Sequence, residues 1–124
     1  MSKRVLSVGQ CVPDHGSISS ALKRHFGAEV VGVDTLSEAE QYCERNGAPD
    51  LILVNRKLDI DYSDGLEVIL ALKAAPTTST APVMLVSNYP EYQAQALTVG
   101  AVPGFGKAEL SQAAALDKLR PFLG

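Results

Sequence analysis

Short runs of apolar residues alternate along the chain with segments whose apolar positions recur every three or four residues. The runs are four or five residues long, as in buried strands, and the longer segments are typical of amphipathic helices. The predicted strands cover residues 5–8, 29–33, 51–54, 83–86 and 102–105. The predicted helices run from 14 or 17 to 26, and over 37–46, 65–75, 90–99 and 110–119. This alternation predicts a doubly wound α/β fold, in which helices cover both faces of a parallel sheet.

Capping residues and prolines set the expected ends of these elements. Ser37 and Glu40 fit a capping box, which makes Ser37 the N-cap of the second helix. Gly47 suits a left-handed C-cap for the same helix. Pro121 is expected to close the last helix, and Pro103 places the fifth strand at a sheet edge, where a missing amide donor costs little.

Composition narrows the class of protein. A chain of 124 residues, 46% hydrophobic and 20% charged, predicts one globular domain over residues 1–124. The net charge of −3 and the absence of a Lys/Arg cluster argue against nucleic acid or membrane as a partner. Two cysteines without a Cys-x-x-Cys pair, and no long apolar segment, predict a cytoplasmic protein with reduced thiols.

The functional crevice of such a fold lies at the carboxyl ends of the strands. Residues 9–14 are expected to form a loop there, after the first strand. The residues predicted to meet at this edge are Gly9, Gln10, Cys11, Asn55, Arg56, Ser87, Asn88 and Lys107.

Several segments together carry a resemblance to a known family. Residues 50–56 read Asp-Leu-Ile-Leu-Val-Asn-Arg, residues 65–68 Gly-Leu-Glu-Val, and residues 82–87 Pro-Val-Met-Leu-Val-Ser, and Gly100-Ala101 precedes Lys107. In this order the chain resembles, over nearly its whole length, the receiver domains of response regulators in two-component signalling. The resemblance implies a flavodoxin-like five-stranded sheet in the order 2-1-3-4-5 with five helices.

The resemblance also identifies positions where the family's chemistry is missing. The family holds Mg²⁺ with two acidic residues, which fall here on Gly9 and Gln10, and with a phosphoacceptor aspartate, which falls on Asn55. Ser87 and Lys107 match the positions that contact phosphoryl oxygens. An amide has no anionic oxygen for attack on phosphorus, and Mg²⁺ requires carboxylate or phosphate oxygens. We therefore expect no phosphorylation at Asn55, no Mg²⁺ or other cofactor there, and no enzymatic activity.

What remains is an atypical receiver domain in phosphorelay signalling that acts through protein–protein contacts. The resemblance implies a partner surface that includes Tyr89, Tyr92, Gln95, Val99 and Gly104, with another signalling protein as partner. Homodimerisation through this face is a further hypothesis. Gly104 stands where the family has a switch aromatic, so we expect no aromatic flip.

Three other hypotheses stay open. The crevice could bind a small anion or other ligand, because Lys107, with no acidic partner predicted, and two amides would give it neutral-to-positive character. Cys11 with His15 is a candidate thiol nucleophile and base, although a small buried Cys11 is the favoured interpretation. The acidic loop 59–64 could hold a divalent ion, but a solvated, helix-capping loop is favoured.

Overall fold

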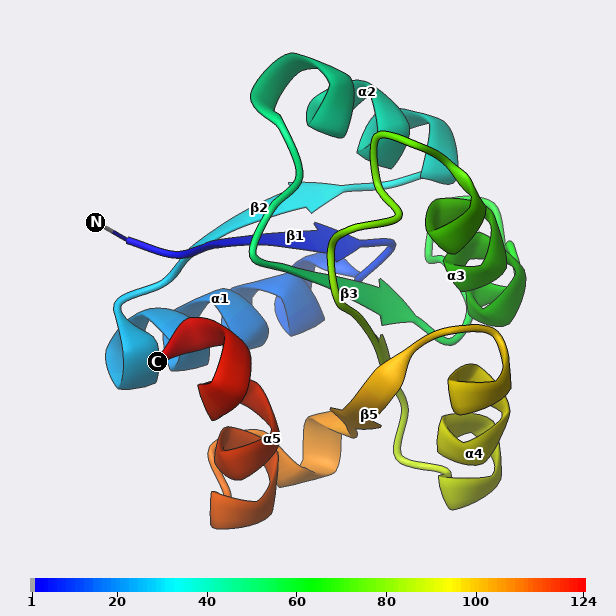
Figure 1. The fold of residues 1–124 in the computed structure, drawn as a ribbon. Coiled ribbons are helices and arrows are strands. Elements are labelled where there is room, and N and C mark those ends of the chain that lie inside the picture. The colour runs from blue at the N-terminus through cyan, green and yellow to red at the C-terminus, as the bar shows by residue number, and fades with distance from the viewer. Residues whose placement is uncertain (1) are drawn as a thin grey trace.

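The computed structural model describes residues 2–124 and contains the predicted five-stranded parallel sheet (Figure 1). The strands are β1 (Arg4–Val8), β2 (Glu29–Val33), β3 (Leu51–Asn55), β4 (Val83–Val86) and β5 (Val102–Phe105). The helices are α1 (Val12–Phe26), α2 (Leu36–Asn46), α3 (Gly65–Ala74), α4 (Pro90–Thr98) and α5 (Ala113–Leu123). The strand order β2-β1-β3-β4-β5 confirms the flavodoxin-like arrangement. Within the described residues, no helix combines the length and apolar content needed to cross a membrane.

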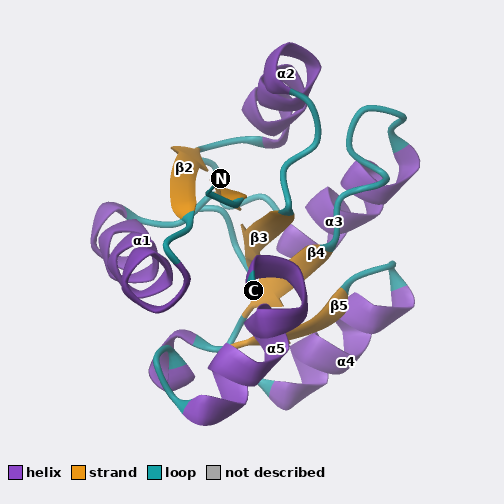
Figure 2. Ribbon diagram, turned by 60° about the vertical axis from the view of Figure 1, so that its left-hand side comes forward, coloured by secondary structure: helices purple, strands orange, loops and turns teal. Residues whose placement is uncertain are grey.

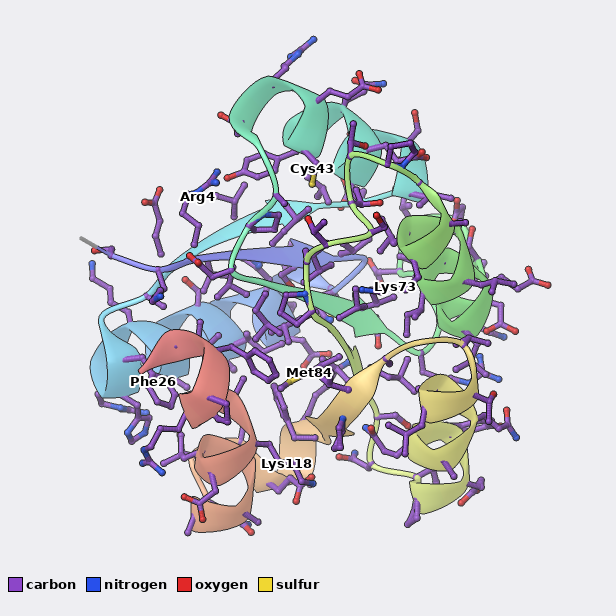
Figure 3. All side chains as sticks on the ribbon, in the orientation of Figure 1. Arg4, Phe26, Cys43, Lys73, Met84 and Lys118 are labelled. Carbon is purple, nitrogen blue, oxygen red and sulfur yellow. The ribbon has the colours of Figure 1, made fainter. Side chains whose placement is uncertain are left out.

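The helices form a layer on each side of the sheet, α1 and α5 on one face and α2, α3 and α4 on the other (Figures 1 and 2). Successive residues of a strand point to opposite faces, and β1 follows this rule. Val5 packs with the α1 and α5 cluster, whereas Leu6 and Val8 pack beneath α2 and α3. Figure 3 shows the same division, with Met84 on the α1 and α5 side and Cys43 on α2, turned toward the sheet.

The first and last helices differ from prediction at their boundaries. The predicted loop 9–14 is wrong in its second half, because α1 begins at Val12 with Cys11 as N-cap and Pro13 in its first turn. Proline is well tolerated there, since its missing N–H has no intrahelical partner in any case. At the other end, a short 3₁₀ turn covers Lys107–Glu109 and α5 runs on to Leu123, with Pro121 inside the helix.

The cap of α2 lies two residues earlier than predicted. The Thr35 hydroxyl accepts the backbone N–H of Glu38 at 3.2 Å, and the Glu38 carboxylate accepts the N–H of Asp34 at 2.7 Å. Thr35 and Glu38 thus take the roles assigned to Ser37 and Glu40, because β2 ends at Val33 and the chain enters the helix at once. The Gly47 C-cap has φ 80° and ψ 169°, which is positive φ but outside the left-handed helical region.

Candidate functional site

The crevice at the carboxyl ends of the strands is built around Lys107. Its Nζ donates to Asp14 Oδ2 at 2.6 Å and to Asn55 Oδ1 at 3.4 Å. Asp14 lies in the first turn of α1, Asn55 ends β3 and Lys107 follows β5. The prediction that Lys107 has no acidic partner is therefore wrong.

Asp14 is the residue of this site that sequence reasoning missed, since it was considered only as a helix cap. The hydrogen bond from Lys107 lowers the pKa of the Asp14 carboxyl, and a hydrogen bond from the Cys11 side chain acts in the same direction. The two side chains of the ion pair, Asp14 and Lys107, are 34% and 32% exposed, so water screens it in part. The Asp14 carboxylate offsets the charge of Lys107, so the crevice is closer to neutral than Lys107 alone would make it.

Asn55 uses both ends of its carboxamide within the site. Its Oδ1 accepts from Lys107, and its Nδ2 donates to the carbonyl of Gly9 at 3.1 Å. This second bond joins the end of β3 to the loop after β1. An aspartate at this position would lack the donor, so the amide is suited to a static structural role.

Gly9 is held in a conformation that excludes a side chain. Its φ is 76°, and an added Cβ would lie 1.9 Å from Leu58 Cδ2. Leu58 belongs to the loop that follows β3, and its side chain is completely buried. The carbonyl of Gly9 also accepts the N–H of Asp59 at 2.9 Å, which ties the two loops together. A carboxylate at this position would need both a strained backbone and displacement of a core leucine.

The residues present do not fit the Mg²⁺ that the receiver resemblance implies. Gly9 supplies no ligand, and Gln10 lines a different cavity, between α1 and β2. Asp14 is paired with Lys107, and Asn55 is held by Gly9 and the same lysine. Nowhere in residues 2–124 do three or more His, Cys, Asp or Glu side chains gather in a way that could hold a metal ion.

Ser87 lies at the crevice just after β4, and its hydroxyl already accepts a hydrogen bond from the chain. Ser87 Oγ accepts the backbone N–H of Tyr89 at 3.2 Å, and the residue is 8% exposed. This is the hydroxyl-capped turn that serine commonly forms after a strand. The cavity beside it measures about 170 Å³. Its lining residues are Asn55, Arg56, Val86, Ser87, Asn88, Tyr89, Tyr92 and Lys107.

A scan of the chain against protein-family models finds no match, and neither does a search of curated proteins. Solved structures do match. A response regulator receiver protein from Pseudomonas putida superimposes with a TM-score of 0.78 at 19% identity, covering 98% of both chains. Chemotaxis response regulator CheY4 of Vibrio cholerae gives 0.72 at 21% identity, covering 99% of this chain and 100% of the other. The phosphorylated cyanobacterial phytochrome response regulator RcpA gives 0.68 at 25% identity, covering 99% and 89%.

The fold is the receiver fold. Identities this low show the architecture alone, and the role of each residue rests on the geometry of this chain. The positions that the receiver resemblance assigns to carboxylates hold a glycine and two carboxamides in this chain, and the crevice contains the Asp14–Lys107 ion pair.

The aromatic residues beside the crevice differ in how freely they are presented. The guanidinium of Arg56 lies 4.1 Å from the ring centroid of Tyr92 and donates to Asp64 at 3.1 Å. Tyr92 is therefore occupied in a cation–π contact. Tyr89 packs edge-to-face on Tyr92, with centroids 5.9 Å apart, and remains 59% exposed. Of the two tyrosines, Tyr89 is the one presented to solvent.

Gly104 is buried and cannot belong to an exposed partner surface, which corrects the prediction. An added Cβ would lie 2.3 Å from the Leu85 carbonyl oxygen and 3.0 Å from the Gln93 amide oxygen. Gln93 was missed by sequence reasoning. Its Nε2 donates to the carbonyls of Leu85 and Ser87 at 2.9 and 3.1 Å, and its Oε1 accepts the N–H of Gly104 at 3.2 Å. Gln93 thus forms a polar clasp between β4 and β5 at Gly104, the position that the receiver resemblance assigns to a switch aromatic.

Phe105 follows on the opposite side of the strand and is completely buried in the α1 and α5 cluster. The other two predicted partner-surface positions lie on α4 or just after it. Gln95 is exposed and Val99 is half-buried.

The acidic side chains of loop 59–64 and the Cys11 thiol make contacts within the chain. Asp61 accepts from both the backbone N–H and the hydroxyl of Ser63, and these bonds lower its pKa. Asp64 caps α3 by accepting from Leu66 at 2.9 Å. The backbone N–H of His15 donates to the carbonyl of Cys11 at 2.8 Å, whereas the side chain of Cys11 lies toward Asp14 and contributes to the lowered pKa of that carboxyl.

Proposed function

We propose that this chain is an atypical receiver domain in phosphorelay signal transduction that acts through protein contacts and without phosphorylation at Asn55. The receiver architecture supports the signalling class, because the solved structures that share it are described as response regulators. In this proposal the domain is a binding module and not an enzyme.

The observation that carries the proposal is the state of Lys107. In a phosphorylated receiver this lysine position would contact a phosphoryl oxygen, whereas here a carboxylate from the chain itself holds Lys107 at 2.6 Å. Asn55 then accepts from the same lysine and donates to Gly9. Because these contacts are intramolecular, the site is held in one arrangement without a phosphoryl group or a metal ion.

Intact-mass measurement after incubation with Mg²⁺ and acetyl phosphate tests the first half of the proposal. We expect no added phosphoryl group on the wild-type chain or on Asn55→Asp, since Gly9 and Gln10 still supply no metal ligand. Asn46→Asp, an exposed position at the end of α2 and outside the crevice, serves as the matched control. A phosphorylated wild type, with Asp59 or Asp61 as first suspects, would return a switch function to the domain. Efficient Mg²⁺-dependent labelling of Asn55→Asp would contradict our account of the metal site.

The partner surface that we propose lies on and just before α4. Tyr89 and Leu97 are 59% and 49% exposed, and Gln95 is exposed on the same helix. Exposed tyrosine is a common anchor at protein interfaces. Homodimerisation through this surface predicts a concentration-dependent mass in light scattering that falls to the monomer value in Tyr89→Ala. A monomer at high concentration in the wild type would remove the dimer hypothesis and leave a different protein as partner.

Binding of a small anion in the crevice is the second candidate, and it has less support. Asp14 offsets the charge of Lys107, and the cavity of about 170 Å³ is small. Titration with phosphate, sulfate and nucleotides, followed by backbone amide shifts, separates the two. Saturable shifts confined to Gly9, Asn55 and Lys107 favour the anion, and unchanged spectra favour the partner module.

A further inference from the structure

A second cavity, of about 230 Å³, lies on the α1 face of the sheet between β1, β2 and the first turns of α1. It arises because two small residues stand side by side, since Ser7 of β1 pairs in register with Gly32 of β2. The preceding pair on the same face, Val5 and Val30, packs into the core instead. His15 covers Gly32 so closely that an added Cβ there would lie 2.9 Å from the imidazole Cε1.

Three polar side chains that line this cavity have atoms without a protein partner. They are Ser7 Oγ, both amide atoms of Gln10, and His15 Nδ1, each buried and unpaired among the described residues. Ser7 is 1% exposed and Gln10 is 8% exposed. Folded proteins satisfy the large majority of such groups. Having several of them unpaired around one cavity points to a molecule that supplies the missing hydrogen bonds.

The lining restricts the chemistry of that molecule. It contains no lysine or arginine, and its one carboxylate, on Asp34, is exposed. A phosphate or carboxylate ligand would face the Asp34 carboxylate, and His15 is the one lining side chain that could offer it a positive charge. Val12 and Val33 contribute apolar surface on the sides of the cavity. The site therefore suits an uncharged ligand with both apolar faces and hydrogen-bonding edges.

The carboxamide of Gln10 specifies which hydrogen-bonding groups the edge of the ligand should carry. A primary amide presents a donor and an acceptor next to each other in one plane, and its best complement is a planar group with the same pair reversed. Nucleobases and aromatic carboxamides carry such an edge, and a glutamine–adenine pair of this kind is a standard contact in nucleic-acid recognition. We propose that this cavity binds a small, uncharged, planar ligand of nucleobase or carboxamide type, with Gln10, Ser7 and His15 as its polar contacts.

This site is separate from the Lys107 crevice, although neighbouring residues serve the two. Gly9 and Asp14 face the crevice, and the residues that follow them, Gln10 and His15, line the second cavity. Weak secondary shifts at the crevice are thus expected when the cavity fills. A variant that alters the cavity alone is therefore needed to tell ligand binding in the cavity from binding in the crevice.

The test is a titration with adenine, cytosine and nicotinamide, each up to its solubility limit, with amide and side-chain resonances followed by NMR. We expect saturable shifts of the Gln10 side-chain amide and the Gly32 amide, with half-saturation in the millimolar range or below. Comparing the two bases with nicotinamide tells a nucleobase source from a carboxamide source.

Gln10→Leu keeps the side-chain volume and removes the donor and acceptor, so binding should fall by at least tenfold. Ser7→Ala is a second, milder variant with the same expected direction. Gln112→Leu, an exposed glutamine beside a different cavity, should bind like the wild type. The proposal is overturned by an absence of saturable shifts with all three probes, including the case in which water alone fills the cavity. Binding that survives in both Gln10→Leu and Ser7→Ala, or shifts confined to Lys107 and Asn55, would also overturn it.

Discussion

Replacing Gly9 by alanine should lower the free energy of unfolding through two contributions, backbone strain and a steric clash with Leu58. Gly9 has φ 76°, and a left-handed conformation costs a non-glycine residue about 1–2 kcal/mol. The added methyl would lie 1.9 Å from Leu58 Cδ2, and such overpacking costs about 1–3 kcal/mol. Together these terms predict a loss of roughly 2–5 kcal/mol.

Gly27→Ala is the matched control for backbone strain. Gly27 also has positive φ, 65°, but no heavy atom lies within 4 Å of the position that an added Cβ would take, so only the conformational term applies. We expect a loss of about 1–2 kcal/mol there. Urea unfolding measures both, and with a slope of about 1–3 kcal/mol per molar the Gly9 variant should show the clearly lower midpoint.

A double-mutant cycle with Leu58→Ala then isolates the clash. Leu58 is completely buried, so its truncation alone should cost about 2–5 kcal/mol. Once the leucine branch is gone, the alanine at position 9 has room, and the double variant should lose less than the sum of the single losses by about 1–3 kcal/mol. If Gly9→Ala costs no more than Gly27→Ala, or the cycle shows no coupling, then position 9 can accept a side chain. In that case our argument against a metal ligand there is wrong.

Three further predictions test other contacts. Asp14→Asn should cost about 0.5–1 kcal/mol near neutral pH, because the pair with its lysine is partly exposed. Because the pKa of Asp14 is lowered in the folded state, its ion pair contributes full stability above the unfolded value near 3.8, and the difference from wild type should disappear as the pH falls through the lowered pKa. Asp117→Asn, at a position 70% exposed, should show little change in stability at any pH. Gln93→Leu should cost about 1–3 kcal/mol in urea unfolding, since it leaves backbone groups of β4 and β5 unpaired, and wild-type stability would contradict the clasp. Burial raises the pKa of Cys43, so a thiol reagent should modify the more accessible Cys11 first and reach Cys43 only on unfolding; equal rates would contradict the packing of α2.

Local sequence was sufficient for the strands and misleading for several helix ends. The predicted strands 29–33, 83–86 and 102–105 match β2, β4 and β5 to the residue, since segments of four or five residues between turn residues are long enough for a strand and too short for a helix. Ser37 and Glu40 fitted a capping box as well as Thr35 and Glu38 do. Which pair forms the cap depends on the residue at which β2 ends. Pro121 lies within α5 and does not end it. Leu119 and Leu123, on either side of the proline, are both buried, so packing against the sheet keeps this last turn helical.

Strand patterns and residue identities can be read along the chain, so the amino-acid sequence was enough for the receiver-type architecture and for a glycine and two carboxamides at the positions that the receiver resemblance assigns to carboxylates. What takes their place became visible only in the packed molecule. Asp14 and Lys107 are 93 residues apart in sequence and 2.6 Å apart in space. Likewise, the blocked Cβ position of Gly9 and the cavity between Ser7 and Gly32 depend on residues from other elements. Charge pairing and steric exclusion act through space, so they follow from how the elements pack and not from the order of residues.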